Sequence, residues 1–567
     1  TDKFHVKAVK PLPRRKLTEK VPLLDCFTAP CKGGCPIGQD IPEYIELNRQ
    51  GRYAEALSLI VEKNPLPFIT GTICAHRCMG KCTRNFYDEP VQIRAEKLAA
   101  AQRGYAALME SLPQPAPVPG VKAAIVGGGP SGLAAAFFLG RAGVACTIFE
   151  QADQLGGVVR QVIPGFRISG EAIDNDVALA LHYGAEVRLG APAPSAAELK
   201  AAGYTHIYYA VGAWKAGKLD IPGNVVPVIG WLKDLKAGKD VPLGHVAVVG
   251  GGNTAMDAAR AALRAGAKSS ALVYRRTRKY MPADAEELEL AMADGVEFLE
   301  LAAPAEQKNG RLIYKKMKLG EPDASGRRAP AETGETGEIP CDTVISAVGE
   351  QVDGALFTAS GVELDAKGRP GFRTNLENVY CGGDAMRGPA TVVEGIADAR
   401  AFADAVIGSV RPVRFPAGSS ASRADAAAKK GVLCESARCE GERCLSCNVV
   451  CECCADVCPN RANVSIELPD GRRQILHVDR MCNECGNCAV FCPYDSAPYR
   501  DKFTLFRTRE EFDKTPNAGF LPLEGRRVLV RVDGDVREAD LDGQNDLPAD
   551  VECLILTVFS HYGYLLG

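Results

Sequence analysis

The chain has 567 residues and carries 67 Lys and Arg against 70 Asp and Glu, a net charge of −3 at pH 7. That length allows several domains with large buried cores. The nearly neutral charge excludes a general polyanion-binding protein, so we expect no nucleic-acid partner.

The longest apolar stretch, 123–149, is broken by glycines and by Arg141, so we expect no membrane insertion. No secretory signal precedes the first cysteines, and cysteine-rich metal spacing without such a signal favours a reducing, cytoplasmic compartment. The chain does not open on Met, which indicates a processed N-terminus or a piece of a longer polypeptide.

Residues 1–118 are expected to form a helical iron–sulfur domain that ends in a proline-rich linker at 111–120. Its candidate metal ligands are six cysteines in two runs: Cys26, Cys31 and Cys35, then Cys74, Cys78 and Cys82. Six thiolates fill one [4Fe–4S] cluster, or two clusters only with outside ligands. The sequence leaves the number of clusters open, with Glu96 as one candidate outside ligand.

From residue 121 the pattern alternates short apolar strands, glycine turns and alanine-rich helices, as in a parallel α/β sheet. Strand 121–126 runs into a G-x-G-x-x-G turn and a helix, and the next strand, 145–149, ends in an acid. This order is typical of a dinucleotide site, where the turn approaches a pyrophosphate and the acid holds a ribose. The FAD-binding residues we predict are Gly127, Gly129, Pro130, Ser131, Gly132, Glu150 and Gly157.

A second copy of the pattern begins with strand 245–249 and the turn Gly250-x-Gly252-x-x-Ala255. Its following strand ends in two arginines instead of an acid, which favours the 2′-phosphate of NADPH over NADH. The alternative is that these arginines only cap the strand or face solvent. The predicted nucleotide-binding residues are Gly250, Gly252, Asn253, Thr254, Ala255, Arg275, Arg276 and Gly349.

The last part of the chain carries two further cysteine runs. The second, Cys482-x2-Cys485-x2-Cys488-x3-Cys492-Pro493, has bacterial ferredoxin spacing. The first is Cys447-x3-Cys451-x2-Cys454-x3-Cys458-Pro459. A disulfide scaffold or zinc ribbon is the alternative, but neither explains the paired Cys-Pro endings. We expect two [4Fe–4S] clusters in crossed ligation: Cys447, Cys451 and Cys454 with Cys492, and Cys482, Cys485 and Cys488 with Cys458.

Several cysteines fall outside these sets. Cys146, Cys341, Cys381 and Cys553 lie in apolar segments that look like strands, and free cysteine is commonly a small buried hydrophobe. Cys444 and Cys453 lie near the cluster runs and could exchange into ligand roles.

These motifs together resemble the small subunit of glutamate synthase and the N-terminal half of dihydropyrimidine dehydrogenase, over about residues 20–410. The ferredoxin-like part is more similar to proteins named as iron–sulfur subunits of selenate reductase. The resemblance implies an FAD domain interrupted by an NADPH domain, with Gly383, Asp384 and Thr391 beside the flavin. It also implies two clusters in the helical domain, one completed by glutamine. Leu23 and the segment 94–97 depart from that pattern.

The expected fold is therefore a multidomain α/β protein. Its domains are a helical iron–sulfur domain (1–118), an FAD domain (121–226 and 365–412), an inserted NAD(P)H domain (227–350), a bacterial 2[4Fe–4S] ferredoxin-like domain (431–500) and a tail (501–567).

The expected function is an FAD-dependent NAD(P)H oxidoreductase subunit. It would pass electrons between NADPH, FAD and [4Fe–4S] clusters, to or from a partner redox protein, ferredoxin being one candidate, in a multi-subunit complex. A flavin is needed because NADPH gives two electrons and a cluster takes one. No catalytic triad, carboxylate pair or Schiff-base lysine stands out, so no second substrate chemistry is expected. The alternatives are a non-catalytic electron-wire or docking subunit, and a flavin-based bifurcating NAD(P)H:ferredoxin oxidoreductase.

Overall fold

The computed structural model describes residues 16–25, 28–322, 328–408, 421–430, 432, 439–449 and 451–567. The chain divides into two compact units. Unit 1 contains 1–56, 76–96 and 416–567, and unit 2 contains 57–75 and 97–415. Unit 1 therefore brings the first cysteine-bearing segments together with about the last quarter of the chain. Cys26 lies outside the described residues.

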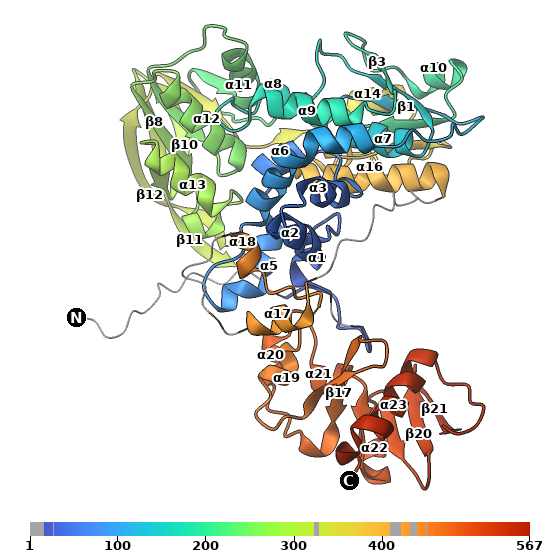
Figure 1. Ribbon diagram of the computed structural model, residues 1–567. Coiled ribbons are helices and arrows are strands. Elements are labelled where there is room, and N and C mark those ends of the chain that lie inside the picture. The colour runs from blue at the N-terminus through green and yellow to red at the C-terminus, as the bar shows by residue number, and fades with distance from the viewer. Residues whose placement is uncertain are drawn as a thin grey trace. The chain divides into compact units, whose positions relative to one another are not determined.

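Unit 2 contains two parallel five-stranded sheets, which Figure 1 draws with their covering helices. Their strands are short, and the central strands are largely buried on both faces, as parallel strands covered by helices are, whereas some edge strands are partly exposed. The first sheet has the order β15 (Val379–Cys381), β4 (His206–Tyr209), β1 (Lys122–Val126), β2 (Ala145–Phe149), β3 (Glu186–Arg188). The second has the order β6 (Val225–Pro227), β13 (Thr343–Ser346), β7 (His245–Val249), β8 (Ser269–Tyr274), β9 (Glu297–Glu300).

The second sheet is an insertion in the first, because β15 returns to the first sheet beside β4. Two short antiparallel strands, β5 (Lys215–Ala216) and β14 (Glu350–Gln351), mark where the chain leaves and returns. β6 belongs to the second sheet, so the chain crosses near residue 216, about ten residues before the expected boundary. An antiparallel sheet of β10 (Ala302–Lys308), β11 (Arg311–Pro322) and β12 (Arg328–Pro340) extends the insertion.

Helices α7 (Pro130–Arg141) and α16 (Val392–Ile407) pack against each other over the first sheet (Figure 1). Tyr208 of β4 stacks on Phe402 of α16, with ring centroids 4.6 Å apart. In the second domain, α12 (Asn253–Arg264) packs on β7 and β8. The helices α7 and α12 each begin at a glycine loop, so their packing on the sheets fixes the positions of the two loops.

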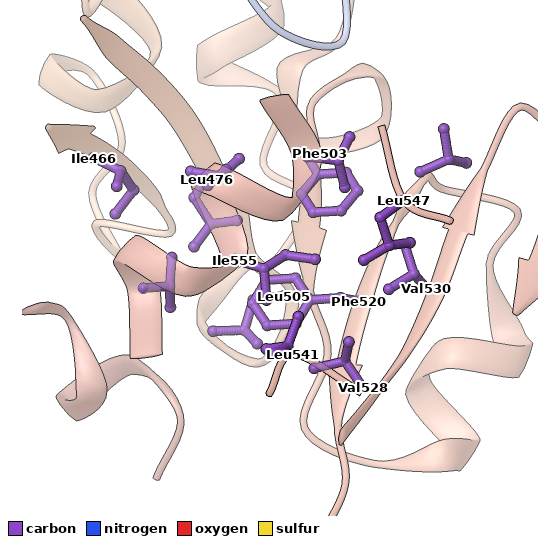
Figure 2. Close-up of a cluster of buried hydrophobic side chains, with 14 of the residues drawn as sticks. Ile466, Leu476, Phe503, Leu505, Phe520, Val528, Val530, Leu541, Leu547 and Ile555 are labelled. Carbon is purple, nitrogen blue, oxygen red and sulfur yellow. The ribbon is translucent and has the colours of Figure 1, made fainter. Parts of the chain in front are cut away.

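In unit 1, the segment expected to be a tail forms one six-stranded sheet with the ferredoxin-like segment. The order is β16 (Asn463–Glu467), β17 (Arg473–Val478), β18 (Thr504–Leu505), β19 (Gly519–Pro522), β20 (Arg527–Val532), β21 (Asp535–Asp540). Figure 2 shows the apolar core of this sheet, in which Leu476, Phe520 and Ile555 lie close together.

Ile555 comes from a helix, α23 (Ala549–His561), so the expectation that the apolar run around Cys553 is a strand is wrong. The run is apolar on several successive positions, which fits a buried strand or a buried helix equally well. Cys553 is half-buried in α23, whereas Cys146, Cys341 and Cys381 are buried, as expected for inert thiols.

Short helices surround the described cysteines of unit 1, most of which lie in the loops beside these helices. From the first part of the chain come α1 (Pro30–Gly33), α2 (Ile41–Arg49) and α5 (Arg77–Lys81). From the last third come α18 (Glu440–Arg443), α19 (Cys453–Asp456) and α20 (Asn487–Phe491). Among the described residues, no helix is both long and apolar enough to cross a bilayer.

Candidate functional site

The first glycine loop joins β1 to α7 through a turn in which two positions accept only glycine. Gly127 has φ of 111°, and its N–H donates to the Phe149 carbonyl at 2.8 Å. A Cβ on Gly132 would lie 1.9 Å from the Gly127 oxygen. A Cβ on Gly129 would meet nothing closer than the Gly157 Cα, at 3.8 Å. The space in front of Gly129 and the start of α7 is therefore open, as pyrophosphate binding requires.

Glu150 stands at the end of β2 on the rim of the same opening. Its buried carboxylate accepts from the Gly128 N–H at 2.7 Å and from the Ala152 N–H at 2.8 Å. A cavity of about 340 Å³ extends from there. Its polar lining includes Glu150 and Asp384, and its glycine lining includes Gly127, Gly129 and Gly157.

The third segment of the site follows β15. Gly383, with φ of 62°, lies so close to Ser131 that a Cβ on it would be 3.0 Å from the Ser131 Cβ. The Asp384 carboxylate accepts from the Ala390 N–H at 3.0 Å, and burial raises its pKa to about 7. Thr391 caps α16, and its N–H and hydroxyl donate to the Glu394 carboxylate at 3.0 and 2.6 Å.

The second glycine loop joins β7 to α12. A Cβ on Gly250 would lie 2.3 Å from the Ala347 carbonyl oxygen, whereas one on Gly252 would meet nothing within 4 Å. Ala255, the third position of the motif, is buried under the sheet. The loop thus has the same tight turn and the same open position as the first loop.

The two arginines at the end of β8 differ in their surroundings. Arg275 is exposed. Arg276 is half-buried, and its Nε donates to the Arg328 carbonyl of β12 at 3.1 Å. That bond leaves the terminal nitrogens of the guanidinium as donors for another acceptor. Gly349 lies at the crossover, where its carbonyl accepts from the Gly217 N–H at 2.7 Å.

A second cavity of about 210 Å³ brings residues of both dinucleotide motifs together. Asn253 and Thr254 line it from α12, and Asp384 and Thr391 line it from the first domain. It shares Asp384, Val158, Ala213 and Ile229 with the first cavity, so the two are neighbours. Cys74, directly after α4 (Pro67–Ile73), also lines it.

Sequence reasoning missed a charged network beside this cavity. Arg167 lines the cavity, pairs with Asp257, and contacts Glu287 at 2.6 Å. Burial raises the pKa of Asp257 to about 6, against the lowering effect of Arg167. No local motif marks Arg167, which reaches Asp257 from 90 positions earlier in the chain.

A loop that lines the first cavity was also missed, although the sequence carries a signal for it. Ala210-Val-Gly212 follows β4, and Ala347-Val-Gly349 follows β13. The repeat of this tripeptide after corresponding strands of the two domains could have identified the loop. Trp214, at its end, lines the first cavity and donates from Nε1 to the Val211 carbonyl at 3.0 Å.

Several of the tail cysteines lie close together in unit 1. Cys454, Cys488 and Cys492 belong to one buried cluster with Leu17 and Val21. Burial raises the pKa of Cys482, and the neighbouring thiols of Cys488 and Cys458 raise it further. Cys35 and Cys78 also belong to unit 1, whereas Cys74 belongs to unit 2.

The donor sets fit the groups that the motifs predict. The open position at Gly129, the carboxylate of Glu150 and the adjoining cavity suit a flavin dinucleotide, and clustered cysteine thiols suit iron–sulfur chemistry. Among the described side chains, no three His, Cys, Asp or Glu are arranged around a single metal ion. The ligands of a cubane bind four different irons, so they need not converge on one point.

Comparison with known proteins agrees with this reading of the chain. The family described as pyridine nucleotide-disulphide oxidoreductase matches residues 121–399. The family described as dihydropyrimidine dehydrogenase domain II, 4Fe-4S cluster, matches residues 13–105. The NADPH glutamate synthase small chain of Escherichia coli is 31% identical over 68% of this chain and 89% of its own length. The chain belongs to the glutamate synthase small-chain family.

Two other relatives extend the comparison. The Escherichia coli protein YgfK, named as an oxidoreductase, is 42% identical over the whole of this chain, which spans 58% of the YgfK length. The beta subunit of the Geobacter sulfurreducens NADPH-Fe(3+) oxidoreductase is 36% identical over 66% of this chain and 63% of its own length. The family matches give this chain the pyridine-nucleotide domain of an oxidoreductase family and a 4Fe-4S domain.

Proposed function

We propose that the chain passes electrons between NADPH, FAD and several [4Fe–4S] clusters, to or from a partner redox protein. The observation that carries this proposal is the second cavity. Residues after the NADPH-type glycine turn and residues of the flavin-type segment line it together. A hydride can pass only between rings in contact, so a shared cavity is the arrangement that the reaction requires.

In this proposal each motif has one task. The N–H groups at the start of α7 hold the flavin pyrophosphate, and Glu150 holds the ribose. Asp384 and Thr391 lie beside the flavin, and the corresponding start of α12 holds the pyrophosphate of NADPH, with Arg275 and Arg276 on its 2′-phosphate. When bound, the flavin accepts two electrons as a hydride and gives them up one at a time. The apolar lining, including Val158 and Ile229, excludes water from the transfer.

We further propose the domain limits and cluster ligands that the spacing predicts. The ferredoxin-like segment would hold two clusters, with Cys447, Cys451, Cys454 and Cys492 on one and Cys458, Cys482, Cys485 and Cys488 on the other. Cys454 and Cys492 belong to one buried cluster, which also includes Cys488, and the neighbouring thiols of Cys482 are Cys488 and Cys458; this proximity supports the crossed pairing. The first segment would add one or two clusters on Cys26, Cys31, Cys35, Cys74, Cys78 and Cys82.

The partner and the final acceptor are proposals by analogy. Relatives of this chain are named as a subunit of an NADPH-Fe(3+) oxidoreductase and of an NADP-dependent formate dehydrogenase. The chain carries no second substrate chemistry that we can identify in its motifs. We therefore propose that it works with a partner subunit or domain that holds the terminal substrate.

Anaerobic mixing with NADPH tests this function. In the wild type, NADPH should bleach the flavin absorbance and then reduce the clusters, whereas an electron-wire subunit would not be reduced by NADPH. The matched control is Gly252→Val. Gly252 has extended backbone and no neighbour near a Cβ, so the variant should fold and keep its flavin. Dithionite should reduce the variant and NADPH should not; equal reduction of both proteins by NADPH would reject the site.

A further inference from the structure

One cavity of unit 1 is lined by cysteines from opposite ends of the chain. Cys31 lies in α1, and Cys82 directly follows α5. Cys444 directly follows α18, and Cys447 comes three residues later. The rest of the lining is mostly apolar: Pro30, Ile41, Pro42, Ile45, Val91, Ile93 and Leu445. Thiols that converge in an apolar pocket form the environment in which iron–sulfur clusters are held.

The cysteines from the last third of the chain are held at this cavity from both sides. Arg443, just before Cys444, donates to the Glu89 carbonyl at 2.6 Å and contacts the Asp88 carboxylate at 3.3 Å. Asn448, just after Cys447, donates to the Glu43 carboxylate at 2.7 Å.

The helix α18 itself packs on the first part of the chain. The Gln92 N–H donates to the Glu440 carboxylate at 2.9 Å. Gly441 lies against α2, where a Cβ would be 2.8 Å from the Arg49 Cβ. Contacts before, within and after the segment therefore fix Cys444 against the N-terminal helices.

The electrostatics show that these thiols are mutual neighbours. Burial raises the pKa of Cys31 well above its usual value, and the thiols of Cys82, Cys444, Cys447 and Cys78 raise it further, in that order. Arg84, which is fully buried, lines the same cavity and pairs with Asp88 at 2.6 Å. These thiols therefore share one buried, mostly apolar pocket with a paired cation in its lining.

The sequence spacing does not assign Cys444 to the ferredoxin-like segment. In the ferredoxin pattern the first three ligands lie three residues apart, as Cys451 and Cys454 do. The ligand before Cys451 would therefore be residue 448, which is Asn448. Cys447 is one position away, and Cys451 is among its neighbouring thiols. Cys447 can therefore be a ligand of the tail cluster, whereas Cys444 matches no ligand position of the ferredoxin pattern.

We propose that Cys444 joins Cys31 and Cys82 as a ligand of a [4Fe–4S] cluster held by both ends of the chain. Each thiol loses its proton, and each sulfur binds one iron. This inference rests on the proposed function only in taking the metal centres to be [4Fe–4S] clusters. Cys447 has Cys444 and Cys82 among its neighbours as well as Cys451, so this cluster adjoins the first tail cluster.

Iron content of the full-length protein, purified without oxygen, tests the assignment. Cys444→Ala should lose about four irons per chain, the content of one cubane. The matched control is Cys439→Ala, because Cys439 is an exposed cysteine five positions earlier that does not line the cavity. The control should keep all its iron. Unchanged iron in Cys444→Ala would overturn the proposal.

Double substitutions identify which cluster Cys444 serves. Cys31→Ala with Cys444→Ala should lose the same four irons as either single change, because both remove one cluster. Cys444→Ala with Cys482→Ala should lose about eight, the sum of two cubanes. A loss of about eight in the first pair would overturn the shared cluster.

Bound flavin in each variant reports that unit 2 is folded, and NADPH reduction of that flavin tests the proposed function separately. If Cys444→Ala is not recovered, Cys444→Ser supplies the measurement. An oxygen ligand should shift the electron paramagnetic resonance signal of one reduced cluster and leave the others in place. A spectrum identical to the wild type would overturn the assignment.

Discussion

At the scale of single residues, two glycines of the first loop should affect different properties: one affects flavin binding and the other affects folding stability. Gly129 has extended backbone with φ of −77° and open space in front of it, whereas Gly132 has no space for a side chain. We therefore expect Gly129→Val to fold with a normal melting temperature but to lose most of its flavin. Gly132→Ala should be destabilised by about 1–3 kcal/mol through overpacking. Flavin absorbance and thermal unfolding measure the two effects, and normal flavin in Gly129→Val would refute the assignment.

The arginines after β8 should set the choice of nucleotide. A guanidinium–phosphate contact of about 1.5–3 kcal/mol corresponds to roughly ten-fold to over a hundred-fold discrimination. Arg276 is positioned by β12, so Arg276→Glu should reduce kcat/KM for NADPH by that factor and leave NADH nearly unchanged. Arg275→Glu is the comparison at the exposed neighbour. If the wild type prefers NADH, or if the substitution lowers kcat/KM equally for both nucleotides, the arginines have only a structural role.

Asp384 should make the stability of the flavin-free protein depend on pH. Its pKa is about 7 in the folded state against an ordinary value of 3.8, so the folded state binds the extra proton between these values. Stability is then full below pH about 4 and falls as the pH rises toward 7, by up to about 4 kcal/mol. Asp384→Asn should lose this slope. Melting temperatures of both apoproteins from pH 4 to 8 measure it, and parallel curves would contradict the prediction.

At the scale of elements, residues 16–25 form a strap across the cysteines of the ferredoxin-like segment. The Leu17 N–H donates to the Pro493 carbonyl at 2.7 Å, and the Val21 N–H to the Ser496 hydroxyl at 2.7 Å. The side chains of Leu17 and Val21 pack against Cys454, Cys488 and Cys492. The strap therefore shields these sulfurs from solvent.

Opening the strap should expose the tail clusters to oxygen. Leu17→Asp places a charge in an apolar contact, so we expect the brown absorbance of the protein to bleach several-fold faster in air. Lys20→Ala is the control, since the Lys20 side chain is 76% exposed within the same strap. Identical bleaching rates for the two variants would show that the strap does not protect the clusters.

At the scale of the whole molecule, the flavin should be independent of the iron that the tail helps to hold. All residues proposed to hold FAD and NADPH lie in unit 2. A chain ending at residue 415 should keep its flavin and lose about twelve irons, eight from the tail clusters and four from the cluster completed by Cys444. Iron and flavin analysis of the purified protein measures both. A loss of only about eight irons would leave the N-terminal cluster independent of the tail.

The sequence by itself determined what depends on local order along the chain. Strand, glycine turn, helix, second strand and a charged residue come within about 30 residues, so Gly127 to Glu150 and Gly250 to Arg276 identify two dinucleotide folds without knowledge of their packing. The spacing of Cys482 to Cys492 similarly predicts a cluster loop. The helix at 549–561 was missed because an apolar run has no period that separates a buried strand from a buried helix.

Only the tertiary structure decided what depends on residues far apart in the chain. Arg167 meets Asp257 across 90 positions, and Cys31 meets Cys444 across more than 400, because sheets and helices between them fold back on themselves. No local pattern can encode such a contact, since each partner looks ordinary in its own segment. The joining of both cysteine-rich ends in one unit, and of both glycine motifs at one cavity, follows from long-range packing alone.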